Sequence, residues 1–120
     1  MSIKNDKIEQ FDRIEPSQRW VRAQVGDKFL VDSKRPLLVW EHGKYPTYFF
    51  PRDDVRLDWL TQTGQTSSRV FWDLTVADRQ VARAAYHYLH QPKLAGYIAL
   101  LWHKVDHWYE EEEEVFLLVD

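Results

Sequence analysis

The chain has 120 residues, of which 44% are hydrophobic and 15% aromatic, enough apolar mass for one domain with a real core. Its net charge of −3 argues against a general affinity for nucleic-acid phosphates, and its lack of cysteine excludes disulfides, a thiolate nucleophile and a thiolate zinc site. Residues 1–10 lack the apolar stretch of a secretory signal, and no run approaches the ~20 apolar residues of a membrane span. We expect a soluble, cytoplasmic protein that binds neither nucleic acid nor membranes.

The first half of the chain predicts an arm followed by short strands. Residues 1–15 mix charged and polar side chains with scattered apolar ones, so we expect a flexible N-terminal arm before a single domain spanning 16–120. Apolar runs that alternate with polar residues, or that are short and bounded by Gly or Pro, are typical of strands. Such runs occur at 20–25, 29–31, 37–40 and 48–50.

The pattern continues with less regular spacing. Apolar and polar residues alternate cleanly over 55–60 and over 70–76, which predicts two more strands. Between them, the polar residues 61–68 predict a flexible loop. The short apolar run 115–119 predicts a closing strand.

Two segments fit either a helix or a strand. Residues 81–89 contain alanines that favour a helix, but Val81 and two tyrosines suit a strand equally well. Residues 94–109 carry the apolar stripe of an amphipathic helix, although 97–102 is also a plausible buried strand followed by a turn.

Four stretches, at 19–33, 47–60, 95–102 and 105–116, resemble the family catalogued as domain of unknown function 427. The most specific piece is YFFPRDDVRLD at 48–58, which is similar to the family's YYFPREDVR signature and the acidic position after it. The VDHWYEE segment at 105–111 is similar to the family's VDAWFEED. Order and spacing agree over roughly residues 15–118.

The resemblance implies a mainly β fold of two antiparallel sheets packed like the sides of a tent, with at most one or two short helical turns. Such a fold looks related to cereblon's ligand-binding domain and to the Yippee-like proteins, which use zinc and bind ligands in aromatic cages. It implies a strand at 97–102 and a helical turn near 103–108. The zinc cage is impossible without cysteine, and residues 65–70 replace a His-Cys-Pro-Tyr-Lys-Gly-like stretch that many members carry.

Aromatic residues next to an arginine suggest a binding site. Aromatic walls bind flat or cationic ligands, and Arg52 could hold an anionic or carbonyl group through its planar fork. The alternatives are structural roles: the rings would form the core, and an Arg–Asp pair would secure a strand end. The candidate ligand-binding residues are Tyr48, Phe50, Arg52, Asp54, Trp72, Tyr97, Trp102, Asp106 and Trp108. We expect a non-catalytic module for a small molecule or a protein, with no metal or cofactor.

A small enzyme that uses carboxylates is the alternative. The family is also labelled nucleotidyltransferase-like, and such chemistry needs paired acidic residues for magnesium together with a phosphate cradle. The acidic candidates are Asp53, Asp54, Asp58 and Asp106, but no Gly-rich element precedes them. Convergence of these carboxylates on one concave surface would favour an enzyme.

The histidines are expected to be ordinary surface or core residues, and the acidic run is expected to be solvated. His87 and His90, like His103 and His107, are spaced for a shared helix face, but a tent fold would separate each pair. The acidic run 110–114 is expected to be a solvated edge, with docking of a basic partner as the alternative.

Overall fold

The computed structural model describes residues 11, 13–41 and 45–116. Within these ranges eleven strands form: β1 (Arg13–Pro16), β2 (Val21–Val25), β3 (Lys28–Ser33), β4 (Leu37–Trp40), β5 (Thr47–Pro51), β6 (Leu60–Gln65), β7 (Arg69–Val76), β8 (Arg79–Tyr88), β9 (Tyr97–Leu100), β10 (His107–Glu110) and β11 (Glu113–Val115). Four short 3₁₀ turns join them: η1 (Arg52–Asp54), η2 (Leu57–Trp59), η3 (Pro92–Leu94) and η4 (Trp102–Lys104). No helix in these ranges is long and apolar enough to cross a membrane.

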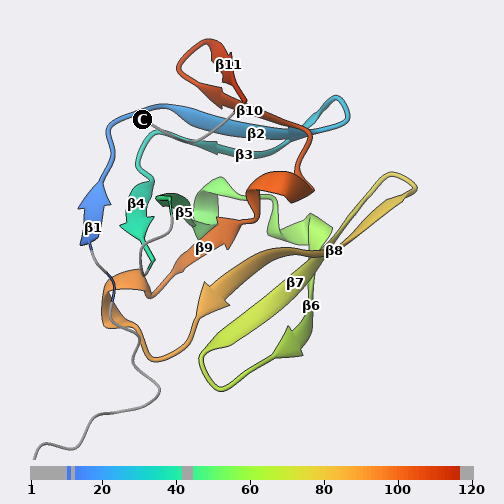
Figure 1. Cartoon of the computed structure of the whole chain (residues 1–120). Helices are drawn as coiled ribbons and strands as arrows, with labels where there is room; N and C mark the ends of the chain where they lie inside the picture. Colours follow the sequence, from blue (N-terminus) through green and yellow to red (C-terminus); the bar gives the residue numbers. More distant parts are fainter. Residues whose placement is uncertain (1–10, 12, 42–44, 117–120) are drawn as a thin grey trace, which may run out of the picture.

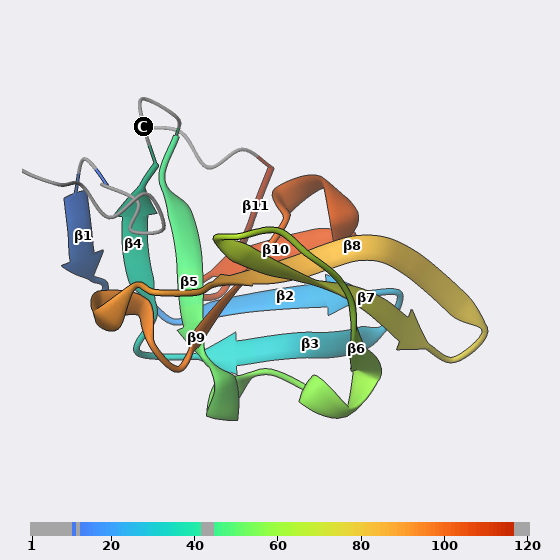
Figure 2. The same cartoon turned by 90° about the horizontal axis from the view of Figure 1, so that it is seen from below.

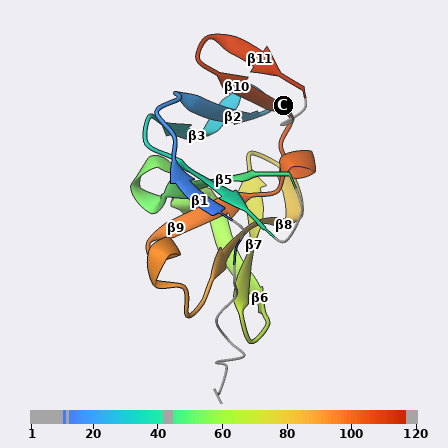
Figure 3. The ribbon, with the colours of Figure 1, turned by 60° about the vertical axis from the view of Figure 1, so that its left-hand side comes forward.

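The strands build two antiparallel sheets. The large sheet has the order β1-β4-β5-β9-β8-β7-β6, and the small sheet has the order β11-β10-β2-β3. Figures 1 and 3 show the small sheet on one side of the large one. In Figure 2, β1, β4 and β5 lie at one end of the large sheet, and β6, β7 and β8 lie at the other. The predicted mainly β, two-sheet fold is confirmed, although the described residues contain four helical turns instead of one or two.

The large sheet buries side chains on both faces. Tyr48 and Phe50 of β5 join a core cluster that also contains Val21 and Val25 of the small sheet. Phe49, between them in sequence, points to the opposite face because successive side chains of a strand alternate. There it joins a second cluster made of Val39, Phe49, Tyr86, Tyr88, Leu94 and Ala99. We call these the inner cluster and the outer cluster.

Three predicted boundaries are wrong near the sheet edges. Residues 13–16, mostly assigned to the flexible arm, pair with β4 as an edge strand, whereas 1–10 lie outside the described residues. The predicted strand 55–60 is interrupted, because Val55 makes an isolated bridge to Val31 and the η2 turn follows. The predicted loop 61–68 is mostly strand β6, whose polar residues face solvent because β6 lies at the edge of the sheet.

Both ambiguous segments form strands. In β8 the alternation is reset by a bulge near Arg83, which has a φ of 51°, and the fully buried Ala84 and Ala85 both join the inner cluster. Two neighbouring buried alanines therefore imitate a helical pattern. The stripe over 94–109 is divided among η3, β9, η4 and β10, so the helix reading is wrong and the implied strand at 97–102 is confirmed over 97–100. Strand β11 ends at Val115, and residues 117–120 lie outside the described ranges.

Candidate functional site

Four of the predicted aromatic residues form one column of rings in the inner cluster. Ring centroids lie 6.0 Å apart for Tyr48 and Phe50, 6.2 Å for Phe50 and Trp108, and 4.6 Å for Trp108 and Trp102. Two polar atoms of the column have partners: the Tyr48 hydroxyl donates to Glu110 at 2.8 Å, and Trp108 Nε1 donates to the Trp102 carbonyl at 3.1 Å. This aromatic column is packed core, with only Trp102 partly exposed.

The other two predicted rings lie elsewhere. Tyr97 packs against the outer cluster, on the face of the large sheet opposite the aromatic column. Trp72, on β7, belongs to the inner cluster and contacts His87 and Arg52. Five of the six predicted aromatic residues therefore lie in or against the inner cluster, and Tyr97 lies on the opposite face of the large sheet.

Asp54 and Arg52 are not paired with each other. The Asp54 carboxylate accepts a hydrogen bond from Ser33 Oγ at 2.7 Å and an ion pair from Arg35 Nε at 3.4 Å. These contacts join η1, which follows β5 of the large sheet, to the end of β3 in the small sheet. Arg35, and not Arg52, is therefore the arginine that pairs with Asp54.

Asp106 ties three segments together. Its two carboxylate oxygens accept hydrogen bonds from the Arg79 guanidinium at 2.6 and 2.8 Å, and one of them also accepts from the Gly26 N–H at 2.7 Å. The hydrogen bonds from Arg79, and then that from Gly26, lower the pKa of Asp106 to about 2. Gly26 lies in the β2–β3 turn and Arg79 begins β8, so Asp106 links the two sheets.

The acidic candidates do not gather. Asp58 pairs with Arg56 through two hydrogen bonds of 3.0 and 2.7 Å, and Asp53 is exposed on η1. Across the described ranges, no three His, Cys, Asp or Glu side chains are grouped so that they could hold a metal. Because Asp54, Asp58 and Asp106 each engage a different arginine, their geometry does not favour carboxylate catalysis.

Arg52 stands beside Trp72 and His87, and we call these three residues the Arg52 cluster. Its backbone N–H donates to the Gly96 carbonyl at 3.1 Å, which fixes the start of η1 to the turn before β9. The ζ carbon of Arg52 lies 5.9 Å from the centroid of the Trp72 ring, within the range of a cation–π contact. In the described part of the chain, no carboxylate pairs with Arg52, and its buried Nε has no hydrogen-bond partner.

His87 completes the Arg52 cluster from the neighbouring strand β8. It is only 9% exposed, and its Nδ1 accepts a hydrogen bond from Trp72 Nε1 at 2.9 Å. Burial, and then the nearby charge of Arg52, lower the pKa of His87. The sequence offered only a weak signal for His87, because its approach to Trp72 depends on the register between β7 and β8.

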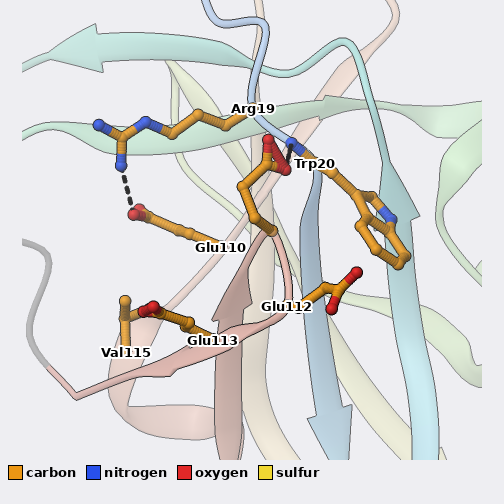
Figure 4. A pocket seen from close by; sticks show the side chains of 7 residues that line it. Arg19, Trp20, Glu110, Glu112, Glu113 and Val115 are labelled. Atoms are coloured by element: carbon orange, nitrogen blue, oxygen red, sulfur yellow. Dashed lines mark hydrogen bonds and ion pairs between the residues drawn. The ribbon is translucent and has the colours of Figure 1, made fainter.

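The acidic run lines a groove of about 780 Å³ on the small sheet, shown in Figure 4. Arg19 pairs with Glu110 across the groove, and the backbone N–H of Trp20 donates to the Glu111 carboxylate at 3.2 Å. Its lining residues are Arg19, Trp20, Glu110, Glu111, Glu112, Glu113 and Val115. Burial, followed by the hydrogen bond to Glu110, raises the pKa of Tyr48 above its usual range. Part of the predicted solvated edge therefore takes part in internal pairing.

A buried carboxylate was missed by sequence reasoning. Glu41 follows β4 and is nearly buried beside the outer cluster, where it accepts hydrogen bonds from Thr47 at 3.0 Å, from Tyr86 at 3.1 Å, and from Tyr88. Burial, and then the charge of Glu41, raise the pKa of Tyr86 beyond its usual range. A single Glu after an apolar run carries no pattern that would predict this network.

The comparisons with known proteins agree with the resemblance in the sequence. A family model described as a domain of unknown function (DUF427) matches residues 13–111. The chain belongs to this family. No curated protein matches the chain. The DUF427 match contains the whole Arg52 cluster and every predicted ligand-binding residue, and it ends at Glu111, within the lining of the acidic groove.

Proposed function

We propose that this DUF427 domain is a non-catalytic binding module that holds a small molecule at the Arg52 cluster. The observation that carries the proposal is the Arg52 guanidinium, which lies over Trp72 and pairs with no carboxylate among the described residues. A guanidinium presents several N–H donors in a rigid plane that matches a carboxylate, a phosphate or a carbonyl group. Arg52 would therefore hold an anionic or carbonyl group of the ligand.

Two other arginines near η1, Arg56 and Arg35, have their charge engaged by a carboxylate, whereas Arg52 has no such partner among the described residues. Arg56, four residues further on, also lies over a tryptophan ring, 4.2 Å from the centroid of Trp59, but its guanidinium is bound to Asp58. Arg35 is paired with Asp54. A guanidinium whose Nε is buried without a partner keeps an unfavourable desolvation cost that a bound anion would relieve.

We propose binding without catalysis because, among the described residues, the neighbours of the Arg52 side chain are Trp72 and His87, and the hydrogen bond to the His87 ring comes from the Trp72 indole, which is not a nucleophile. Trp72 is only 8% exposed, so it supports the guanidinium and leaves little ring face for a ligand. The polar contact to Arg52 would then supply most of the recognition. A cysteine-free chain is compatible with the reducing cytoplasm, where we place this module.

A thermal-shift screen of carboxylates, phosphates, nucleotides and sugars tests the proposal. We expect at least one compound to raise the melting temperature, since a ligand at about 100 times its Kd stabilises the folded state by about 2.7 kcal/mol. Arg52→Ala should abolish that shift, and Arg56→Ala, the matched arginine over a tryptophan, should keep it. A screen without hits, or a hit that Arg52→Ala leaves unchanged, would contradict the proposal.

A further inference from the structure

We propose that His87 is a second ligand donor of the Arg52 cluster, presenting a neutral Nε2–H beside the Arg52 guanidinium, so that the site takes a monoanionic carboxylate group. This inference rests on the proposed function, because it names the chemistry of the ligand that Arg52 would hold. Three features of the cluster support it: the tautomer of His87, the second nitrogen of its ring and the charge of the site.

The tautomer follows from the contact with Trp72. An indole Nε1–H can only donate, so His87 Nδ1 must accept the hydrogen bond of 2.9 Å between them. A neutral imidazole whose Nδ1 is an acceptor carries its proton on Nε2. The contact also limits rotation of the imidazole, because the two rings are packed with centroids 5.7 Å apart. Trp72 is therefore a positioning residue for the His87 donor.

The second nitrogen of His87 is left for another partner. Within the described residues, the buried side-chain nitrogens without a partner are Nε atoms of arginines, and His87 Nε2 is not among them. Among the described residues, the His87 side chain makes no hydrogen bond besides the one from Trp72. We therefore infer that the Nε2–H is unpartnered and open to solvent, on a residue that is 9% exposed.

The charge of the cluster sets the kind of anion. Arg52, from η1, is the charged group whose field acts on His87, and the Trp72 indole from β7 is neutral. Burial and this positive neighbour lower the pKa of His87, which keeps its ring neutral near pH 7. The site then offers one positive charge and one neutral donor. A single carboxylate is compensated by one charge, whereas a phosphate dianion would leave a second charge poorly compensated.

NMR on the intact chain tests the tautomer without any variant. With ¹⁵N-labelled histidine, long-range proton–nitrogen correlation should show His87 near pH 7 with its proton on Nε2 and with Nδ1 as an acceptor. Trp72→Phe, which removes the indole donor and keeps a ring, should weaken this tautomer preference. An Nδ1–H tautomer or a protonated ring in the wild type would overturn the inference.

Binding is tested with benzoate as the carboxylate probe and inorganic phosphate as the dianion, by following the Arg52 Nε–H and His87 resonances up to about 50 mM ligand. Benzoate should shift both residues, and it should bind more tightly than phosphate. His87→Leu should weaken benzoate binding about tenfold, the equivalent of one lost hydrogen bond to a charged group, and His87→Gln, which keeps an N–H donor, should restore part of it.

The outcomes separate this inference from the proposed function. Benzoate binding that depends on Arg52 but is unchanged in a folded His87→Leu variant would overturn the role of His87 and leave the binding module standing. Tighter binding of phosphate would overturn the monoanion assignment. If neither probe shifts Arg52, the inference is overturned, and the proposed function is decided by the thermal-shift screen.

Discussion

Replacing Asp106 by Asn removes one charge from the junction of the two sheets and changes little else. Asn is nearly the same size as Asp, and its carbonyl oxygen can still accept the hydrogen bond from Gly26. What it loses is the charge that faces the Arg79 guanidinium at 2.6 and 2.8 Å. The variant therefore isolates the ionic part of the contact that joins the β2–β3 turn to β8.

The magnitude follows from the pKa of Asp106, which the hydrogen bonds from Arg79 and Gly26 lower to about 2 in the folded chain. An Asp in an unfolded chain has a pKa near 3.9, so the shift of roughly 2 units corresponds to an upper limit of about 2.5 kcal/mol. The side chains of Asp106 and Arg79 are 29% and 46% exposed, and solvent screening reduces the contribution to about 1 kcal/mol.

The sign of the pH dependence follows from the same shift. Because the folded pKa is lowered, the stabilisation is fully present above the unfolded pKa and is lost as the pH falls from about 4 to about 2. Urea unfolding at pH 7 should show Asp106→Asn about 1 kcal/mol less stable than the wild type, a decrease in melting temperature of about 4 °C. The difference should shrink steadily below pH 4.

Asp58→Asn is the matched control, because it breaks an Arg–Asp pair of similar geometry that is exposed and local. It should change stability less than Asp106→Asn does. If the two variants are equally stable at pH 7, or if the effect of Asp106→Asn is the same at pH 2 and pH 7, the ionic link between the sheets is refuted.

Three further changes test the packing. Trp108→Ala removes a buried ring from the aromatic column and should lower the free energy of unfolding by about 3–5 kcal/mol in urea titrations. Phe116→Ala is the control and should have little effect, because the Phe116 side chain is 77% exposed. Tyr86→Phe removes a hydroxyl that donates to the buried Glu41 and should lower it by about 2 kcal/mol; an unchanged midpoint would contradict the network. Gly26→Ala places a side chain at a φ of 60° and should lower the melting temperature by the equivalent of about 1 kcal/mol.

The strands with regular alternation could be predicted from the sequence. In β2, Val21, Ala23 and Val25 are buried and the residues between them are partly exposed, which is the pattern that predicted the strand. Prediction failed where the physical environment removes this pattern. The edge strand β6 is mostly exposed on both faces, and the bulge in β8 places Ala84 and Ala85 together in the core.

Only part of the candidate site could be predicted from the sequence. The sequence indicated Arg52 and the aromatic residues, but neither their partners nor their burial. Asp106 meets Arg79 and Gly26 across 27 and 80 residues, and such long-range pairs depend on how the sheets pack. His87 was expected to be ordinary, because only the pairing of β7 with β8 brings its ring to Trp72.

A crystal structure of the chain with the best carboxylate found by the thermal-shift screen tests the central claim most directly. We predict that the carboxylate lies within hydrogen-bond distance of the Arg52 guanidinium, with His87 Nε2 as a second donor. A ligand bound elsewhere, for example in the acidic groove beside Trp20, with Arg52 left unoccupied, would contradict the account.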